Sequence, residues 1–170
     1  EEPQLGESEP GFAERFFTIK PLFEFESIWT PAEGLAVGYG SGVLAIRGTN
    51  AVPNYAVGAA PWAAFLPETR VVSVGRDVPR IGANAFEGCS NIEYLTIPSG
   101  VTSIGGYAFK GCSGLMSVTI PSGVTNIHYS AFSGCVGVKE FVCEETKDSL
   151  FRSVDGCLCW KYGEGVALVR

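Results

Sequence analysis

The chain has 170 residues, of which 46% are hydrophobic and 18% charged, and its formal net charge at pH 7 is −6. A net negative chain without clustered lysine and arginine argues against binding to nucleic acid or to anionic membrane surfaces. It contains no apolar run of about 18 residues, so we expect no membrane insertion. The length fits one domain, and 22 glycines with few charges are typical of a β-rich fold.

Residues 1–27 are predicted to be an N-terminal leader or linker. They begin with EEPQLGESEPG, whose acidic composition is typical of disorder. The segment FAERFFTIKPLFEF follows, and its partial alternation predicts a strand or a segment packed on one end of the fold. No signal peptide is visible, and the acidic start would suit a mature secreted protein whose leader has been removed.

Residues 28–68 are predicted to form an N-terminal β-hairpin cap. The glycine-rich stretch GYGSG at 38–42 separates two apolar runs, which predicts a hairpin over 28–48 with its turn in that stretch. It resembles a phosphate-binding loop only superficially, because no helix pattern and no lysine follow it. Residues 49–68 are predicted to be a loop held by Tyr55 and Trp62.

Residues 69–143 repeat with a period of 23 residues. The rows are 69–91, 92–114, 115–137 and a partial fourth at 138–143. The second and third rows agree at 13 of their 23 positions, and the first three rows carry the string A-F-x-G-C at the same phase. A fixed period of this size indicates a solenoid, in which each repeat forms one coil and buries its apolar face against its neighbours.

Each row opens with the apolar pattern L-x-x-L-x-L of a short strand. We predict parallel strands near 71–74, 94–97, 117–120 and 140–143, with the fourth and sixth positions of each row pointing inward. Prolines follow two of these strands and end them. One phenylalanine per row is expected to stack into a buried spine, and these residues are Phe86, Phe109 and Phe132.

Residues 144–170 are predicted to form a C-terminal β cap. The segments FRSVDG, CLCWKY and VALVR are separated by turn residues, which predicts strand, turn and strand. Atypical β segments at both ends of the repeats would close the open ends of the solenoid.

The repeat pattern also resembles a known family. I-P-S-G-V-T-x-I-x-x-x-A-F-x-G-C, at 97–112 and 120–135, is similar to the BspA-like, treponemal-type leucine-rich repeats of bacterial surface proteins. The tryptophan- and glycine-rich segment 28–62 resembles the lead-in to the first repeat, and 153–160 resembles a segment that interrupts or ends such arrays. The resemblance implies an α/β, β-rich fold: a right-handed leucine-rich-repeat solenoid with β-hairpin caps at both ends.

The cysteines have a simple structural interpretation. Cys89, Cys112 and Cys135 share one phase, so they should form a column about 4.8 Å apart. Their Cβ vectors would run parallel, whereas a disulfide needs convergent ones and zinc needs a tetrahedron. We therefore predict buried, reduced thiols in this column and at the inward-facing Cys143. For Cys157 and Cys159, on one face of a strand, packing, a disulfide and a metal site all remain open.

Catalytic residue patterns are sparse. His128 occupies a row position that holds glycine in the other two rows, which predicts an exposed site on the convex side, where reversion to glycine should be nearly neutral. Its spacing from Ser130 is interpreted as coincidence and not as a nucleophile pair. Acidic residues after the third row lack the order of a calcium loop and predict a solvated edge; they are Glu140, Glu144, Glu145 and Asp148. We therefore expect no enzyme activity, no metal and no cofactor.

The remaining candidate site is the outward face of the predicted strands, on the concave side of the solenoid. This face mixes one tyrosine with hydroxyl and aliphatic side chains, which suits a contact surface but also an ordinary solvated sheet. The residues expected to contact a ligand are Tyr94, Thr96, Ser117, Thr119, Glu140 and Val142.

The sequence and the resemblance together predict a non-catalytic bacterial module, secreted or on the cell surface. It would act as a monomer and bind an extracellular protein or glycan, without nucleic acid as a partner. One alternative is a purely structural spacer within a larger surface protein. Another is a lectin-like domain that uses aromatic residues of the N-terminal cap as a sugar platform, namely Trp29, Tyr39, Tyr55 and Trp62.

Overall fold

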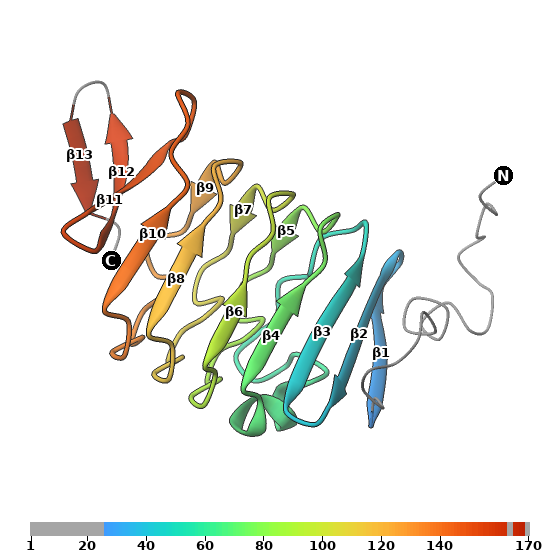
Figure 1. Ribbon diagram of the computed structural model, residues 1–170. Coiled ribbons are helices and arrows are strands. Elements are labelled where there is room, and N and C mark those ends of the chain that lie inside the picture. Colours follow the sequence, from blue (N-terminus) through green and yellow to red (C-terminus); the bar gives the residue numbers. More distant parts are fainter. Residues whose placement is uncertain (1–25, 163–164, 169–170) are drawn as a thin grey trace, which may run out of the picture.

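The computed structural model describes residues 26–162 and 165–168, so residues 1–25 of the predicted leader or linker lie outside the described residues. The described residues form a β-rich solenoid of about three turns, with one short 3-10 helix at Ala63–Glu68. Strands line the front of the solenoid and shorter strands line its back (Figure 1). None of the helices among the described residues is long and apolar enough to cross a membrane.

The front strands belong to two hydrogen-bonded sheets. The first sheet contains five strands, in the order β1 (Ser27–Ala32), β2 (Leu35–Gly40), β3 (Val43–Gly48), β4 (Val71–Val74) and β6 (Tyr94–Thr96). The second contains β8 (Ser117–Ile120) and β10 (Glu140–Cys143). Neighbouring strands from β3 to β6, and β8 with β10, pair in parallel, as the repeat predicts.

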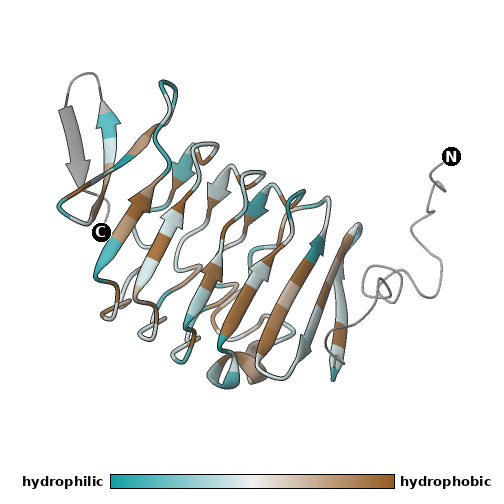
Figure 2. Ribbon diagram, in the orientation of Figure 1, coloured by the Kyte–Doolittle hydropathy of each residue, from teal (hydrophilic) through white to brown (hydrophobic). Residues whose placement is uncertain are grey.

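The back of the solenoid is a small parallel sheet of β5 (Arg80–Ile81), β7 (Ser103–Ile104) and β9 (Asn126–Ile127). Each 23-residue coil therefore contains a front strand, a turn, a back strand and the A-F-x-G-C turn. Hydrophobic residues recur along the strands β3, β4, β8 and β10 (Figure 2). The repeat positions thus determine the front strands, the back strands and the apolar interior between them.

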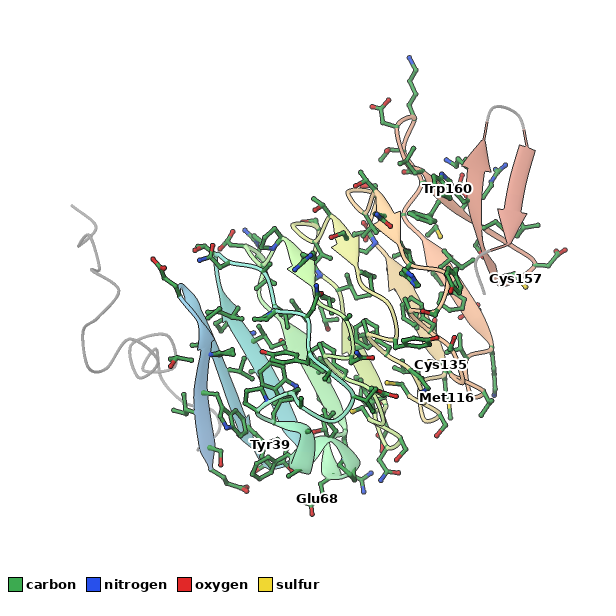
Figure 3. The ribbon with its side chains drawn as sticks, turned by 180° about the vertical axis from the view of Figure 1, so that it is seen from behind. Tyr39, Glu68, Met116, Cys135, Cys157 and Trp160 are labelled. Atoms are coloured by element: carbon green, nitrogen blue, oxygen red, sulfur yellow. The ribbon has the colours of Figure 1, made fainter. Side chains whose placement is uncertain are left out.

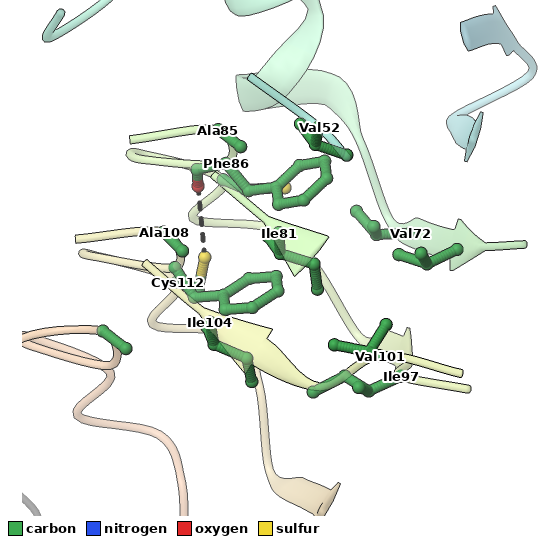
Figure 4. Packing of buried hydrophobic residues seen from close by; sticks show 14 of the residues in the cluster. Val52, Val72, Ile81, Ala85, Phe86, Ile97, Val101, Ile104, Ala108 and Cys112 are labelled. Carbon is green, nitrogen blue, oxygen red and sulfur yellow. Dashed lines mark hydrogen bonds between the residues drawn. The ribbon is translucent and has the colours of Figure 1, made fainter. Parts of the chain in front are cut away.

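The phenylalanine spine is confirmed. The ring of Phe109 stacks on Phe86 with centroids 5.3 Å apart and planes 12° apart, and on Phe132 at 5.3 Å and 8°. Phe86 and Phe109 are fully buried. Figure 4 shows the Phe86 ring beside isoleucine and valine side chains of the core. Burial of one such side chain contributes about 1.5–3 kcal/mol, so the spine is a large part of the core.

The N-terminal end differs from the expected hairpin. Strands β1, β2 and β3 form an antiparallel meander of three strands, because the segment before β2 also pairs. Strand β2 extends to Gly40, so the turn contains only Ser41 and Gly42 and not the whole 38–42 stretch. Both turn residues have positive φ, 51° and 76°, which suits the two-residue turns that favour tight hairpins.

The aromatic residues of this end fill its interior. Trp62 is fully buried and its indole Nε1 donates a hydrogen bond to the Ala85 carbonyl at 2.8 Å. Tyr39 is 3% exposed and lies inside the N-terminal end (Figure 3). The rings of Trp29 and Tyr55 contact Trp62 edge-on, at 6.3 and 5.5 Å between centroids. Burial raises the pKa of Tyr55 to about 12.

The cysteine column has one property that sequence reasoning missed. The second and third thiols each donate a hydrogen bond to a carbonyl of the preceding coil: Cys112 to Phe86 at 3.4 Å, and Cys135 to Phe109 at 3.0 Å. The first thiol, Cys89, donates within its own coil to the Thr69 carbonyl at 3.7 Å. Figure 4 shows the bond from Cys112 to Phe86. Cysteine is thus a buried donor here as well as a small apolar residue. Cys112 is fully buried, but Cys135 is only half-buried, and so is Cys143 on β10. The expectation of burial is therefore wrong for these two thiols.

The C-terminal end is an antiparallel sheet of β11 (Phe151–Val154), β12 (Cys157–Tyr162) and β13 (Gly165–Leu168). Phe151 and Leu158 are buried, and the Phe141 amide on β10 donates to the Gly156 carbonyl at 2.8 Å. Within this end, Cys159 is buried in packing and Cys157 is exposed. Of the acidic residues after the third row, Glu145 lies 3.6 Å from Arg152 and 3.9 Å from Lys161 and so ties this end together.

Candidate functional site

The strand face, meaning the outward side chains of β4, β6, β8 and β10 with the residues that begin those strands, carries the candidate site. Alternation along a strand sends successive side chains to opposite sides. On β8, for example, Val118 and Ile120 are buried whereas Ser117 and Thr119 are exposed. The pattern of the repeat therefore places hydroxyl and aromatic side chains on the outside.

A break between β6 and β8 interrupts this face. At the neighbouring coil boundaries, the amide of Glu93 donates to the Arg70 carbonyl at 2.7 Å and that of Lys139 donates to Met116 at 2.9 Å. The described residues contain no equivalent bond from Met116 to Glu93, and β6 and β8 lie in separate sheets. The coils remain joined at the back by β7 and β9. The front of the solenoid is thus parted between the second and third coils.

A groove of about 460 Å³ lies over this break. Its residues come from β6 and β8 and from the residues just before these strands; they are Glu93, Tyr94, Leu95, Thr96, Gly114, Met116, Ser117 and Thr119. Tyr94 is 67% exposed and Met116 is 64% exposed, although both are large apolar side chains. The size lies in the range of small-ligand pockets, which is about 300–1,000 Å³.

Charges border the groove at its two sides. The Glu93 carboxylate pairs with the Arg70 guanidinium at 2.7 Å, and both side chains are solvent-exposed. On the other side, the Ser117 hydroxyl donates to the Glu140 carboxylate at 3.5 Å. At the N-terminal side of the face, the half-buried Arg47 covers Ser73, and burial lowers the pKa of the Arg47 guanidinium. Apart from Glu93, the groove is lined by apolar and hydroxyl groups.

The structure brings four of the six predicted ligand-contacting residues around the groove: Tyr94, Thr96, Ser117 and Thr119. Glu140 and Val142 are exposed on β10, opposite Ser117 and Thr119 in the parallel register, and lie outside the groove lining. The residues expected from the sequence to contact a ligand did not include Met116, Leu95 or Gly114. A sheet break leaves no mark in a repeat whose rows agree so closely, so no pattern could have identified the groove.

The pair of His128 and Ser130 is closer than the spacing suggested. The Ser130 hydroxyl lies 2.7 Å from the imidazole Nδ1, and the Ser130 amide donates to the same nitrogen at 3.2 Å. Ser130 is only 2% exposed, so a substrate cannot reach its oxygen. The imidazole therefore closes a local turn, and the pair does not form a nucleophile site.

The side chains of the groove are suited to binding a ligand and not to catalysing a reaction. Glu93 is the acidic residue of the lining, and Arg70 already neutralises it. Tyr94 and Met116 supply apolar area, while Thr96, Thr119 and Ser117 supply hydroxyls that can donate or accept hydrogen bonds. Such a mixture resembles the composition of a protein interface more than that of an acid–base centre.

Comparison with known proteins agrees with the repeat period. The family model described as "BspA type Leucine rich repeat region (6 copies)" matches residues 72–154. The matched stretch begins inside the first row and contains the rest of the three rows and the partial fourth. The six copies belong to the description of the family model. Among curated protein sequences, no significant match is found.

Solved structures of leucine-rich repeat proteins are also similar. One from Eubacterium ventriosum is 19% identical, with a TM-score of 0.53, over 79% of this chain and 48% of that chain. A leucine-rich repeat protein of Treponema pallidum is 22% identical over 66% of this chain and 70% of that one, with a TM-score of 0.38. A leucine rich cell surface protein from Faecalibacterium prausnitzii is 17% identical over 86% and 62%, with a TM-score of 0.37.

This chain thus spans about half the length of the Eubacterium ventriosum protein, and the likeness shows the fold that the two share. The 23-residue coils, the stacked A-F-x-G-C turns and the family match describe the same part of the molecule. The leucine-rich repeat array of this chain belongs to the BspA-type family.

Proposed function

We propose that this chain is a non-catalytic repeat module, secreted or on a bacterial surface, that binds a protein or glycan partner through the groove on its strand face. The observation that carries the proposal is the groove itself, with Tyr94 and Met116 exposed on the two coils that it separates. The location follows from the resemblance of the repeats to those of bacterial surface proteins.

Tyrosine and methionine suit this role for different reasons. Tyrosine offers a large rigid ring with a polar tip, and such residues often dominate binding energy. The unbranched thioether of methionine adapts to surfaces of different shape. The threonine and serine hydroxyls beside them can pair with the polar groups of either a polypeptide or a sugar. A partner that covers Tyr94 and Met116 would bury apolar area and keep its polar groups hydrogen-bonded.

The aromatic residues of the N-terminal cap give less support to a sugar platform. Trp62 and Tyr39 are buried, and Tyr55 and Trp29 pack against the Trp62 ring. The rings of Trp62 and Tyr39 are therefore not available for stacking on a sugar, and those of Trp29 and Tyr55 are half-buried. The alternative of a spacer without a ligand is tested by the ligand searches described next, because a spacer should capture no ligand.

The test begins with a glycan array and a pull-down with extracellular-matrix proteins, followed by affinity measurements on whichever ligand is captured. Tyr94→Ala should then weaken binding by about 1–2 kcal/mol, or roughly five- to thirtyfold. Tyr129→Ala is the matched control, because Tyr129 is also highly exposed, at 71%, but lies in the turn after the back strand β9. The melting temperature of both variants should stay within about two degrees of the parent.

Two results would reject the proposal. If both searches find no ligand, the spacer interpretation is favoured. If a ligand binds Tyr94→Ala as well as the parent, the groove is not its site. A further variant, Glu140→Lys, should change the salt dependence of association when a charged partner reaches across to β10.

A further inference from the structure

The last complete coil is covered on the front of the solenoid but not along its back edge. On the front, β10 pairs with β8 in parallel. On the back, β9 pairs with β7 on one side, and no described strand pairs with its other side. The chain turns away after the partial fourth row and forms the C-terminal sheet instead (Figure 1). One half of the coil-to-coil interface is therefore missing at this end.

The missing half can be specified atom by atom, because the same hydrogen bonds occur at both upstream boundaries. Two amides of each coil donate back to the preceding coil, and two amides of the preceding coil donate forward. Between the first and second coils, the bonds are Thr102 to Pro79 (2.8 Å), Gly105 to Ile81 (2.9 Å), Phe86 to Ala108 (2.8 Å) and Gly88 to Lys110 (2.8 Å). Between the second and third coils, they are Thr125 to Thr102 (2.8 Å), His128 to Ile104 (3.0 Å), Phe109 to Ala131 (2.9 Å) and Gly111 to Ser133 (2.9 Å).

The third coil has the same four groups, but no described strand pairs with this side of β9. The carbonyls of Thr125 and Ile127 and the amides of Phe132 and Gly134 have no hydrogen-bond partner among the described residues. They are two acceptors and two donors at the spacing that the coils use twice upstream. An unpaired edge of this kind is a template for another strand.

The interior behind this edge is nevertheless closed. The Phe141 ring packs edge-on against Phe132, with centroids 5.3 Å apart, and Phe132 is only 9% exposed. The exposed side chains beside the edge include Tyr129, at 71%, and Val136, at 86%. An occupant would therefore be held mainly by its main chain, with apolar contacts at the rim.

We propose that this edge is a second binding site, which accepts a segment of another polypeptide that adds a short strand beside β9 and then follows the A-F-x-G-C turn. The segment would run parallel to β9 and donate to Thr125 and Ile127 while accepting from Phe132 and Gly134. The upstream interfaces specify this occupant, because they show the complementary arrangement twice within the same solenoid. The proposal does not depend on the groove of the strand face, since the two sites share no residue.

A whole second copy of this chain fits the edge less well. The corresponding back strand at the other end of the solenoid, β5, is already covered, because the Val52 amide donates to Arg80 at 2.9 Å and the Tyr55 amide to Ala83 at 2.9 Å. A second copy therefore does not offer a free back strand at that end for head-to-tail pairing. A free segment has no such obstacle.

Hydrogen exchange of the full chain, read at single amides by NMR, first tests whether the edge is open. The Phe132 and Gly134 amides should exchange at least about tenfold faster than their counterparts Phe109 and Gly111 in the second coil. Equal protection of the two pairs at low protein concentration would mean that the edge is already covered, and would overturn the proposal. Protection that rises with protein concentration would assign the edge to a second copy and would equally overturn it.

The second test uses a probe that carries the complementary groups. A labelled peptide with the sequence of residues 124–137, with Ser in place of Cys135, presents the donors and acceptors that the third coil uses against the second. It should bind the full chain and slow exchange of the Phe132 and Gly134 amides, and the Tyr94→Ala variant should bind it equally well. The control peptide carries Thr125→Pro and His128→Pro, which removes both donors.

Loss of binding with the proline peptide is the expected result. Absence of binding by the unmodified peptide at millimolar concentration would refute the proposal, as would equal binding of both peptides. Binding that disappears in Tyr94→Ala would place the peptide in the groove and would also contradict the edge assignment. Because the two sites respond to different variants, failure at one leaves the other testable.

Discussion

The second and third coils have nearly the same motif but different surroundings. Their rows agree at 13 of 23 positions, yet Phe109 and Cys112 are fully buried whereas Phe132 is 9% exposed and Cys135 is half-buried. The second coil lies between two complete coils, and the third has a complete neighbour on one side only. A residue's place in the array thus sets its burial as much as its identity does. In a solenoid, stability depends on interfaces between neighbours, so the same substitution should cost different amounts in the two coils.

The largest difference should appear in the phenylalanine spine. Phe109→Ala removes a ring that is stacked on both faces, and such truncations cost about 3–5 kcal/mol of unfolding free energy. Phe132→Ala should cost less, about 2–3 kcal/mol, because solvent and the Phe141 ring can partly fill the space. Urea denaturation of both variants, at equal m-value, measures the difference. Equal losses would show that the C-terminal sheet closes the third coil as tightly as a complete coil would.

A smaller effect is expected where two coils approach most closely. A Cβ at Gly105 would lie 2.6 Å from the Ala83 backbone nitrogen, so Gly105→Ala must push the first and second coils apart. We expect a loss of about 1–3 kcal/mol in the free energy of unfolding. The matched control is Gly106→Ala, whose Cβ would meet the exposed His128 ring at 3.2 Å, a side chain that can move. If Gly106→Ala is as damaging as Gly105→Ala, backbone contact between coils is not the cause.

His128 shows how the structure revises an expectation from the repeat. Reversion to glycine seemed neutral from the rows alone, but the imidazole accepts hydrogen bonds from the Ser130 amide and lies 2.7 Å from its buried hydroxyl. His128→Gly removes both contacts and adds backbone freedom, so we expect a loss of about 1 kcal/mol. His128→Asn, whose side-chain oxygen can accept from Ser130, should recover part of it. Thermal unfolding of the parent and the two variants measures these losses. An unchanged melting temperature in His128→Gly would show that the reversion to glycine is neutral, as the rows alone predict.

The sequence predicted whatever repeats and missed whatever interrupts the repetition. The period placed the strands, the stacked phenylalanines and the cysteine column, because those features depend on residues that recur at one phase. It did not show that Tyr94 and Met116 border a break between β6 and β8, since both coils carry strand-forming residues there. It also did not predict β1 as a third strand of the cap, because Ser27–Ala32 contains a proline and has no strict alternation. Of the candidate site, four outward residues could be named in advance, but the groove that joins them depends on how two coils are spaced.

The cysteine column allows the finest comparison of the second and third coils, because each carries the thiol in the same turn. The neighbouring Cys135 and Cys89 thiols, together with burial, raise the pKa of the Cys112 thiol, so its reactive thiolate is scarce in the folded protein. Cys135 is half-buried at the open end of the column. Iodoacetamide at pH 8 should therefore label Cys135 at least about tenfold faster than Cys112 in the native protein, as followed by peptide mass spectrometry. In denaturant the two rates should converge, which provides the internal control.

Because the raised pKa keeps Cys112 protonated in the folded state, its contribution to stability should be complete at neutral pH and should fall as the pH rises above about 8.5, where the thiol of the unfolded chain ionises. Cys112→Ala should remove that part of the alkaline loss. Native labelling of Cys112 at the rate of Cys135 would show that the second coil opens as readily as the last one, and the difference between the two coils would then lie in their static burial alone.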